Sequence, residues 1–260
     1  MLLGYLFLFV LGLVFGSFIT ALSWRIPREI SFVKGRSVCP NCRNKISWYD
    51  NIPLLSYIIL GGKCRNCKKQ ISLRYPLIEI ATALGFIVIF YFANTFKGLT
   101  LQSVNDVFTL TFYLVIFLIL LTIFIIDLGY QIIPDSLTFA GISVTFFYLL
   151  LTASNSIFNV VFSGFLAATF LLFVHLVTKG KGMGLGDVKF AVLGGMITGL
   201  KLMPAWLFLS FLTGAAVGII LILIGKAKMK TKIAFGPFLI LGIALTLAFG
   251  NNIIRLIGLE

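Results

Sequence analysis

Acidic residues and histidine are scarce in this sequence. Its 260 residues contain 8 Asp and Glu, 21 Lys and Arg, and one histidine. One histidine cannot make a conventional catalytic zinc site, which takes several imidazole and carboxylate ligands. No serine lies in the Gly-x-Ser-x-Gly setting of a nucleophile elbow. These absences direct attention to the few carboxylates.

Charged residues of both signs are also few, at 11% of the chain, whereas hydrophobic residues make up 60%. The mean hydropathy of +1.09 excludes an ordinary soluble domain. Crossing a bilayer takes about 20 apolar residues in a helix. The sequence therefore predicts an all-α polytopic membrane protein with about eight transmembrane helices. The predicted spans are Leu2–Trp24, Pro76–Thr95, Val107–Ile126, Leu137–Ala153, Ile157–Val177, Val188–Leu200, Pro204–Gly225 and Phe238–Ile254.

The first apolar run is predicted to be a retained span and not a secretory signal. No Lys or Arg precedes Arg25, and the run exceeds the length of a typical signal core. The only long polar connection follows it. We therefore divide the chain into a first transmembrane helix (1–24), an inserted polar module (25–75) and a seven-helix membrane domain (76–260).

The net charge of +13 is distributed unevenly along the chain. If the N-terminus is outside, 18 basic residues fall on cytoplasmic segments and only Lys97, Lys201 and Arg255 fall outside. An excess of Lys and Arg on cytoplasmic loops is the usual topology signal. The charge therefore indicates a side of the membrane and not a nucleic-acid partner.

All four cysteines lie in the polar module, as the pairs Cys39/Cys42 and Cys64/Cys67. Two C-x2-C pairs can place four thiolates tetrahedrally around one zinc ion. Because such a site has no open coordination position, the zinc would be structural, and its binding would supply much of the folding free energy of this small module. The predicted cytoplasmic location disfavours the alternatives, which are structural disulfides and a redox pair.

Asp127 and Asp187 are the acids that lack an ordinary structural explanation. Asp127 ends an apolar run, where the negative end of the helix dipole disfavours a carboxylate. Asp187 opens another run, in the string Gly184-Leu185-Gly186-Asp187. Both are predicted on the cytoplasmic side, so they can meet. Because the cysteines are assigned to a metal site, a hydrolase built from this chain would be an aspartyl hydrolase. The spacing of the two acids alone equally allows two unrelated charges at the membrane interface.

Three other polar residues receive structural interpretations. Asp135 precedes an apolar run and is predicted to cap its helix. Glu79 lies near a helix start, where the dipole favours a carboxylate, although a functional role stays open. His175, inside the fifth span, is predicted to be packed or hydrogen-bonded to another helix.

A series of short motifs follows the chain in a fixed order. They are Gly16-Ser17-Phe18, Arg25-Ile26-Pro27, Cys39-Pro40-x-Cys42, 48–57, 62–67, 71–79, Asp127 with Ile133-Pro134-Asp135, Gly184-x-Gly186-Asp187-x-Lys189, and Phe235-Gly236-Pro237-Phe238. Through these stretches the chain resembles the type IV prepilin peptidases over most of its length. One departure is Thr20, where the family usually has asparagine.

This resemblance implies a bifunctional enzyme of the bacterial cytoplasmic membrane. Such an enzyme cuts the short basic leader from prepilins and pseudopilins, after a glycine, at the cytoplasmic face. It then methylates the new N-terminal amine with S-adenosylmethionine. The family's catalytic aspartates fall on Asp127 and Asp187, in a GxGD-type intramembrane protease, and its cysteine module falls on Cys39, Cys42, Cys64 and Cys67.

Two other function classes fit parts of the sequence. A proton-coupled transporter would use Asp127 and Asp187 as an intramembrane relay. A membrane-anchored adaptor would use the zinc module to bind a partner. The sequence assigns neither the residues that bind S-adenosylmethionine nor the oligomeric state.

Overall fold

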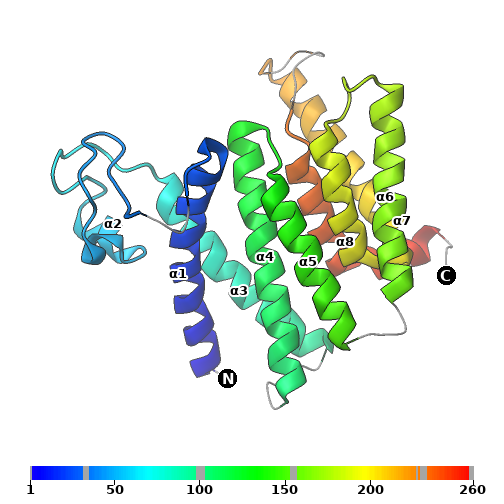
Figure 1. The fold of residues 1–260 in the computed structure, drawn as a ribbon, viewed down its shortest axis with the longest axis horizontal. Helices are drawn as coiled ribbons and strands as arrows, with labels where there is room; N and C mark the ends of the chain where they lie inside the picture. The colour runs from blue at the N-terminus through cyan, green and yellow to red at the C-terminus, as the bar shows by residue number, and fades with distance from the viewer. Residues whose placement is uncertain are drawn as a thin grey trace. The chain divides into compact units, whose positions relative to one another are not determined.

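The computed structural model describes residues 2–31, 35–97, 103–152, 157–226, 228 and 233–257, without the side chains of 96, 97 and 251–257. Helices account for most of this part of the chain (Figure 1). The elements are α1 (Leu2–Arg25), η1 (Ile26–Arg28), η2 (Trp48–Asn51), α2 (Leu55–Ile59), α3 (Arg74–Lys97), α4 (Val104–Tyr130), α5 (Asp135–Thr152), α6 (Ile157–Val177), α7 (Leu185–Leu223) and α8 (Gly236–Ile257).

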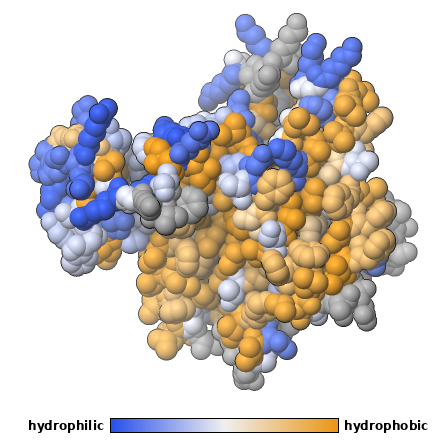
Figure 2. All heavy atoms as spheres, viewed as in Figure 1, coloured by the Kyte–Doolittle hydropathy of each residue, from blue (hydrophilic) through white to orange (hydrophobic). Residues whose placement is uncertain are grey.

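Six helices among the described residues are long and apolar enough to cross a membrane, and they are α1, α3, α4, α5, α6 and α7. The first five coincide with the first five predicted spans, which confirms the predicted all-α membrane fold. Of the residues named in the sequence analysis, Ala153 lies outside the described part, and Lys97 and Arg255 are described without their side chains. Figure 2 shows hydrophobic residues covering the helices and hydrophilic residues covering much of the module after α1.

The sixth and seventh predicted spans together form α7. Gly199, with φ 69° and ψ 170°, interrupts the helical backbone between them, and Pro204 follows. A residue with positive φ ends one helical segment, and proline is tolerated near the start of the next. The eighth predicted span corresponds to α8, whose described apolar part, Gly236–Gly250, is shorter than a standard span.

The chain divides into two compact units, Met1–Thr122 and Ile123–Glu260, and the boundary falls within α4. We call them unit 1 and unit 2. In unit 1, α1 packs closely on α3 because two glycines face it. A Cβ at Gly12 would lie 2.5 Å from Ala83 Cα, and one at Gly16 would lie 2.6 Å from Glu79 Cα. The adjacent core includes Leu8, Phe86, Phe90, Ala93, Leu110 and Leu114.

In unit 2, α7 is the central helix and contacts α5, α6 and α8. The α6 contact is close, because a Cβ at Gly195 would lie 2.7 Å from the carbonyl oxygen of Ser163. The Ser163 hydroxyl donates to the Gly195 carbonyl at 3.0 Å. On the α8 side, the buried Trp206 indole donates to the Leu239 carbonyl at 2.8 Å. These contacts hold α7, the helix that carries Asp187, against α6 and α8.

Candidate functional site

The four cysteine sulfurs converge in unit 1. All four Sγ atoms lie within 4.8 Å of one another, and Cys39 Sγ is 3.9 Å from Cys67 Sγ. A tetrahedral zinc ion with Zn–S bonds of about 2.3 Å separates its sulfurs by about 3.8 Å. The cluster therefore fits a metal ion with little adjustment.

The two cysteine pairs have the same backbone architecture. In each pair the first cysteine donates its N–H to a carbonyl five residues later, Asn44 or Lys69, at 3.0 and 2.9 Å. In each turn the fourth residue after the first cysteine, Arg43 or Lys68, has φ 57°. These paired turns aim both sulfurs of each pair at one point, as predicted from the C-x2-C spacing.

The thiols within the cluster differ in acidity. Backbone N–H groups of Cys67 and Asn66 lower the pKa of the Cys64 thiol to about 7. The Asn44 N–H also acts to lower the pKa of Cys42, but burial and the other three thiols outweigh it and raise this pKa to about 11. Protons are therefore shared unequally among the sulfurs, and a bound metal would displace them.

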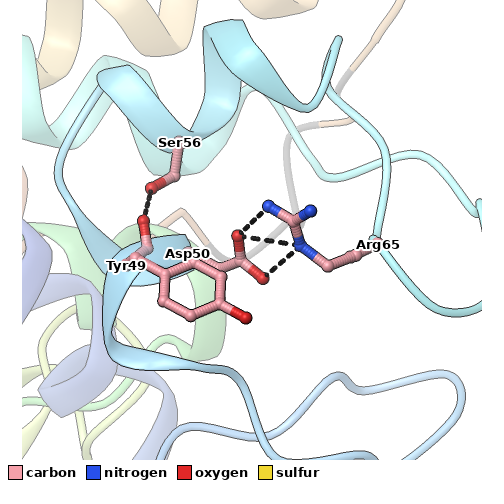
Figure 3. Close-up of polar contacts among 4 residues, drawn as sticks. All are labelled: Tyr49, Asp50, Ser56 and Arg65. Atoms are coloured by element: carbon pink, nitrogen blue, oxygen red, sulfur yellow. Dashed lines mark hydrogen bonds and ion pairs between the residues drawn. The ribbon is translucent and has the colours of Figure 1, made fainter.

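An ion pair fastens the second cysteine turn to the segment between the two turns (Figure 3). The Arg65 guanidinium donates to both oxygens of Asp50 and makes its shortest contact at 2.7 Å. This guanidinium lowers the pKa of Asp50 below its ordinary value. The Ser56 hydroxyl donates to the Tyr49 carbonyl at 2.8 Å, which ties α2 to the same segment.

Glu79 links the module to the helices of unit 1. Its side chain is buried, and its Oε2 accepts the backbone N–H of Leu54 at 2.9 Å. The Ser17 hydroxyl of α1 also hydrogen-bonds to this carboxylate. The sequence placed Glu79 near a helix start but gave no sign of these two contacts, which join residues far apart in the chain.

Asp127 lies in the last turn of α4, within unit 2. It is only 4% exposed, and its Oδ2 has no hydrogen-bond partner among the described residues. The backbone amide of Gly236, at the start of α8, lies against the carboxyl group. A Cβ at Gly236 would lie 2.5 Å from Asp127 Oδ2, so only glycine fits there without a shift.

Asp187 lies in the first turn of α7 and is 8% exposed. Its Oδ2 accepts the N–H of Gly184, the N-cap residue, at 3.0 Å. This bond and the positive end of the helix dipole both favour the ionised carboxylate. The GxGD string therefore builds a helix start that holds an acid in place.

The fold brings Asp127 and Asp187 into one region of unit 2. Ile133 contacts both Gly186, which precedes Asp187, and Gly236, which faces Asp127. A Cβ at Gly186 would lie 3.3 Å from Ile133 Cβ, and a Cβ at Gly236 would lie 3.1 Å from Ile133 Cδ1. The two carboxyl groups lie close enough to interact electrostatically. Two acids beside bare glycine backbone form an arrangement suited to acid–base chemistry on a peptide.

Asp135 and His175 have structural partners at the same end of α7. Lys189 Nζ contacts the Asp135 carboxylate at 2.7 Å, and both side chains are about half exposed. Asp135 is the first residue of α5, and its carboxylate pairs with Lys189 of α7, a contact that the sequence analysis did not predict. His175 Nδ1 lies 2.7 Å from the Met183 carbonyl, so it is hydrogen-bonded as predicted, but to the segment preceding α7.

Comparisons with known proteins match both parts of the chain. Residues 10–93 match the bacterial peptidase A24 N-terminal domain, and residues 114–219 match the type IV leader peptidase family. The first range contains the four cysteines and Glu79, and the second contains Asp127 and Asp187.

Curated relatives are similar over most of the chain, and each is named a prepilin leader peptidase/N-methyltransferase. The Pseudomonas aeruginosa protein is 33% identical, with 95% of this chain and 90% of the relative covered. The Bacillus subtilis protein is 32% identical, with 95% of each chain covered. The Vibrio cholerae protein is 34% identical, with 79% of this chain and 81% of the relative covered. No solved structure matches the chain.

Proposed function

Because this chain belongs to the prepilin leader peptidase/N-methyltransferase family, we propose that it removes the leader from type IV prepilins or pseudopilins and methylates the new N-terminus. The observation that carries the peptidase assignment is the pair of buried acids, Asp127 and Asp187, beside Gly186 and Gly236. Burying an acid in a membrane domain costs free energy, and acids retained there usually mark functional sites. No observation favours the transporter or the adaptor.

In the proposed cleavage, Asp187 is the base and Asp127 is the acid. Asp187 accepts a proton from water, whose oxygen attacks the carbonyl carbon of the scissile peptide, while Asp127 donates its proton to the carbonyl oxygen. The tetrahedral intermediate then collapses. The C–N bond breaks as Asp187 passes the proton that it took from water to the amine. A hydroxyl of the intermediate returns a proton to Asp127, and the leader leaves with a carboxyl group.

The hydrogen bonds support this division of roles. Asp187 accepts a backbone N–H at the start of α7, an environment that suits an anion. Asp127 sits at the opposite kind of helix end, and its buried Oδ2 lacks a donor among the described residues. A neutral carboxyl group loses less in such a place. Two close carboxylates sharing one proton are the usual solution when both cannot ionise cheaply.

The proposed function involves two further groups, a structural zinc ion in the module and a methyl donor for the methylation step. Cys39, Cys42, Cys64 and Cys67 would hold zinc, which would stabilise the fold of residues 25–75 without an open position for substrate. S-adenosylmethionine would supply the methyl group that the new N-terminal amine receives.

The charge distribution supports a cytoplasmic location for the active site and the module. The 18 basic residues assigned to cytoplasmic segments include those around both cysteine pairs and Lys189 beside Asp187. In this proposal residues 76–260 form the protease membrane domain, residues 1–24 anchor the module, and the apolar helix of the pilin docks from the bilayer of the cytoplasmic membrane.

Incubation of the purified full-length protein with a prepilin and S-adenosylmethionine in detergent tests this function. We expect release of the leader after its glycine and a mature N-terminus heavier by the mass of one CH2. Cleavage without the added mass would restrict the function to the peptidase. No cleavage, together with proton-coupled solute uptake in liposomes, would instead favour the transporter.

A further inference from the structure

A cavity of about 390 Å3 lies in unit 1, between the cysteine module and the ends of α1 and α3 that meet it. This volume lies in the range of small-molecule sites, roughly 300–1,000 Å3. All its lining residues belong to unit 1, so the site does not include the Asp127 and Asp187 region. The lining residues used below are Ser17, Ala21, Trp24, Arg25, Tyr75 and Glu79.

Glu79 places a buried carboxyl group in the wall of the cavity. The residue is 7% exposed, and its described partners are the Leu54 N–H and the Ser17 hydroxyl. Within the part of the chain that the structure describes, ion pairs are formed by Asp50 and Asp135, and Glu79 has none. A buried carboxylate without a cation is costly, so a positively charged ligand in this cavity would gain an ion pair.

The other lining groups suit a ligand that is partly aromatic. Trp24 and Tyr75 contribute ring surface, which stacks well on a planar heterocycle. Arg25 supplies a cation for a ligand carboxylate. S-adenosylmethionine combines these features, since it carries an adenine ring, a sulfonium, an ammonium and a carboxylate.

We propose that this cavity binds the methyl donor, S-adenosylmethionine, and that Glu79 contacts one of its two positive charges. The inference rests on the methyltransferase half of the proposed function. It adds the place of binding, which neither the motifs nor the similar proteins identify.

Binding measured on the zinc-loaded full-length protein tests the role of Glu79. Glu79→Gln keeps an oxygen for the Leu54 N–H but removes the charge, so we expect its dissociation constant for S-adenosylmethionine to rise at least about tenfold. The control is Glu29→Gln, which removes an exposed acid outside the cavity lining. This variant should bind S-adenosylmethionine as tightly as the wild type does. Equal affinities of both variants and the wild type would overturn the inference.

A second variant keeps the test decisive if Glu79→Gln loses its fold, as judged by zinc content and thermal unfolding. Ala21 lines the cavity, and Ala21→Leu would fill part of it. We expect this variant to keep its zinc and to bind the donor at least about tenfold more weakly than the wild type. Unchanged affinity would contradict the proposal.

Ultraviolet cross-linking of labelled S-adenosylmethionine, followed by peptide mapping, locates the site independently. Label within residues 17–79 supports the inference. Label within 123–260, in a preparation that methylates a pilin, would overturn the inference and leave the proposed function intact. If the wild type neither binds the donor nor methylates, both the inference and the methyltransferase half of the function fail.

Discussion

Asp127 occupies a position that stability alone does not explain. An acid in the last turn of α4 faces the negative end of the helix dipole, and burial removes it from water. Gly236 leaves just enough room for the carboxyl group, because a side chain there would collide with it. The position of Asp127 therefore lowers the stability of the fold, which indicates that the residue serves a function.

Gly236→Ala should lower kcat/KM for prepilin cleavage by about 100-fold, because its Cβ would displace Asp127 from its working position. Steady-state kinetics in detergent measures the change. Gly218→Ala is the matched control, since the nearest atom to its Cβ is 3.9 Å away. A Gly236→Ala enzyme as active as this control would mean that the position of Asp127 does not limit cleavage.

The placement of individual residues was predictable from the sequence where it depends on local sequence. The cysteine spacing predicted the cluster, and helix-end arguments singled out Asp127 and Asp187. The contact of Glu79 with Leu54 and the ion pair of Asp135 with Lys189 were not predicted, because they join residues 25 and 54 positions apart. No local pattern encodes such distant contacts, which only the packed helices create.

At the scale of elements, close packing of α1 on α3 depends on Gly12 and Gly16. Gly12→Ala should destabilise the protein by about 1–3 kcal/mol, because its Cβ would meet the α3 backbone at Ala83. Thermal unfolding in detergent measures the effect. Gly4→Ala, whose Cβ meets nothing within 4 Å, should be neutral or slightly stabilising. Equal unfolding temperatures for the two variants would contradict this packing.

The module is the element whose stability depends on metal. Chelation should remove one zinc ion per chain and unfold residues 36–74, because this segment has little hydrophobic core beyond the cluster. Trypsin should then cut at the basic residues of the module, whereas α7 stays protected in the detergent micelle. An unchanged digestion pattern after complete zinc removal would show that the module folds without metal.

Apolar runs predicted most helices because length and hydropathy are properties of the local sequence. The bounds of α6 agree residue for residue, and α1 extends only one residue beyond its predicted end. The sequence separated α7 into two spans, and the structure places the break at Gly199. Sequence periodicity could not predict α2 or η2, since both are too short to carry a pattern and depend on the module around them.

At the scale of the whole molecule, the proposed chemistries use different parts of the chain. The metal cluster and the donor cavity belong to unit 1, and the aspartates belong to unit 2. The two family matches, over residues 10–93 and 114–219, follow a similar division. Changes in one unit should therefore affect one activity more than the other.

The uneven charge predicts the orientation of the whole chain. Trypsin added to inside-out membrane vesicles should cut the zinc-free module, whereas trypsin added to right-side-out spheroplasts should leave it intact. Mass spectrometry of the released peptides measures the difference. Release from spheroplasts alone would reverse the proposed topology and place the active site outside.

Cleavage kinetics of three single variants test the central claim most directly. Asp127→Asn and Asp187→Asn should each lower kcat/KM by at least about 1,000-fold, since each removes one proton-transfer group. Asp135→Asn should stay within about tenfold of the wild type, because its exposed pair with Lys189 contributes little. Retained cleavage in Asp127→Asn or Asp187→Asn, or an equally severe loss in Asp135→Asn, would contradict the assignment of Asp127 and Asp187 as the catalytic pair.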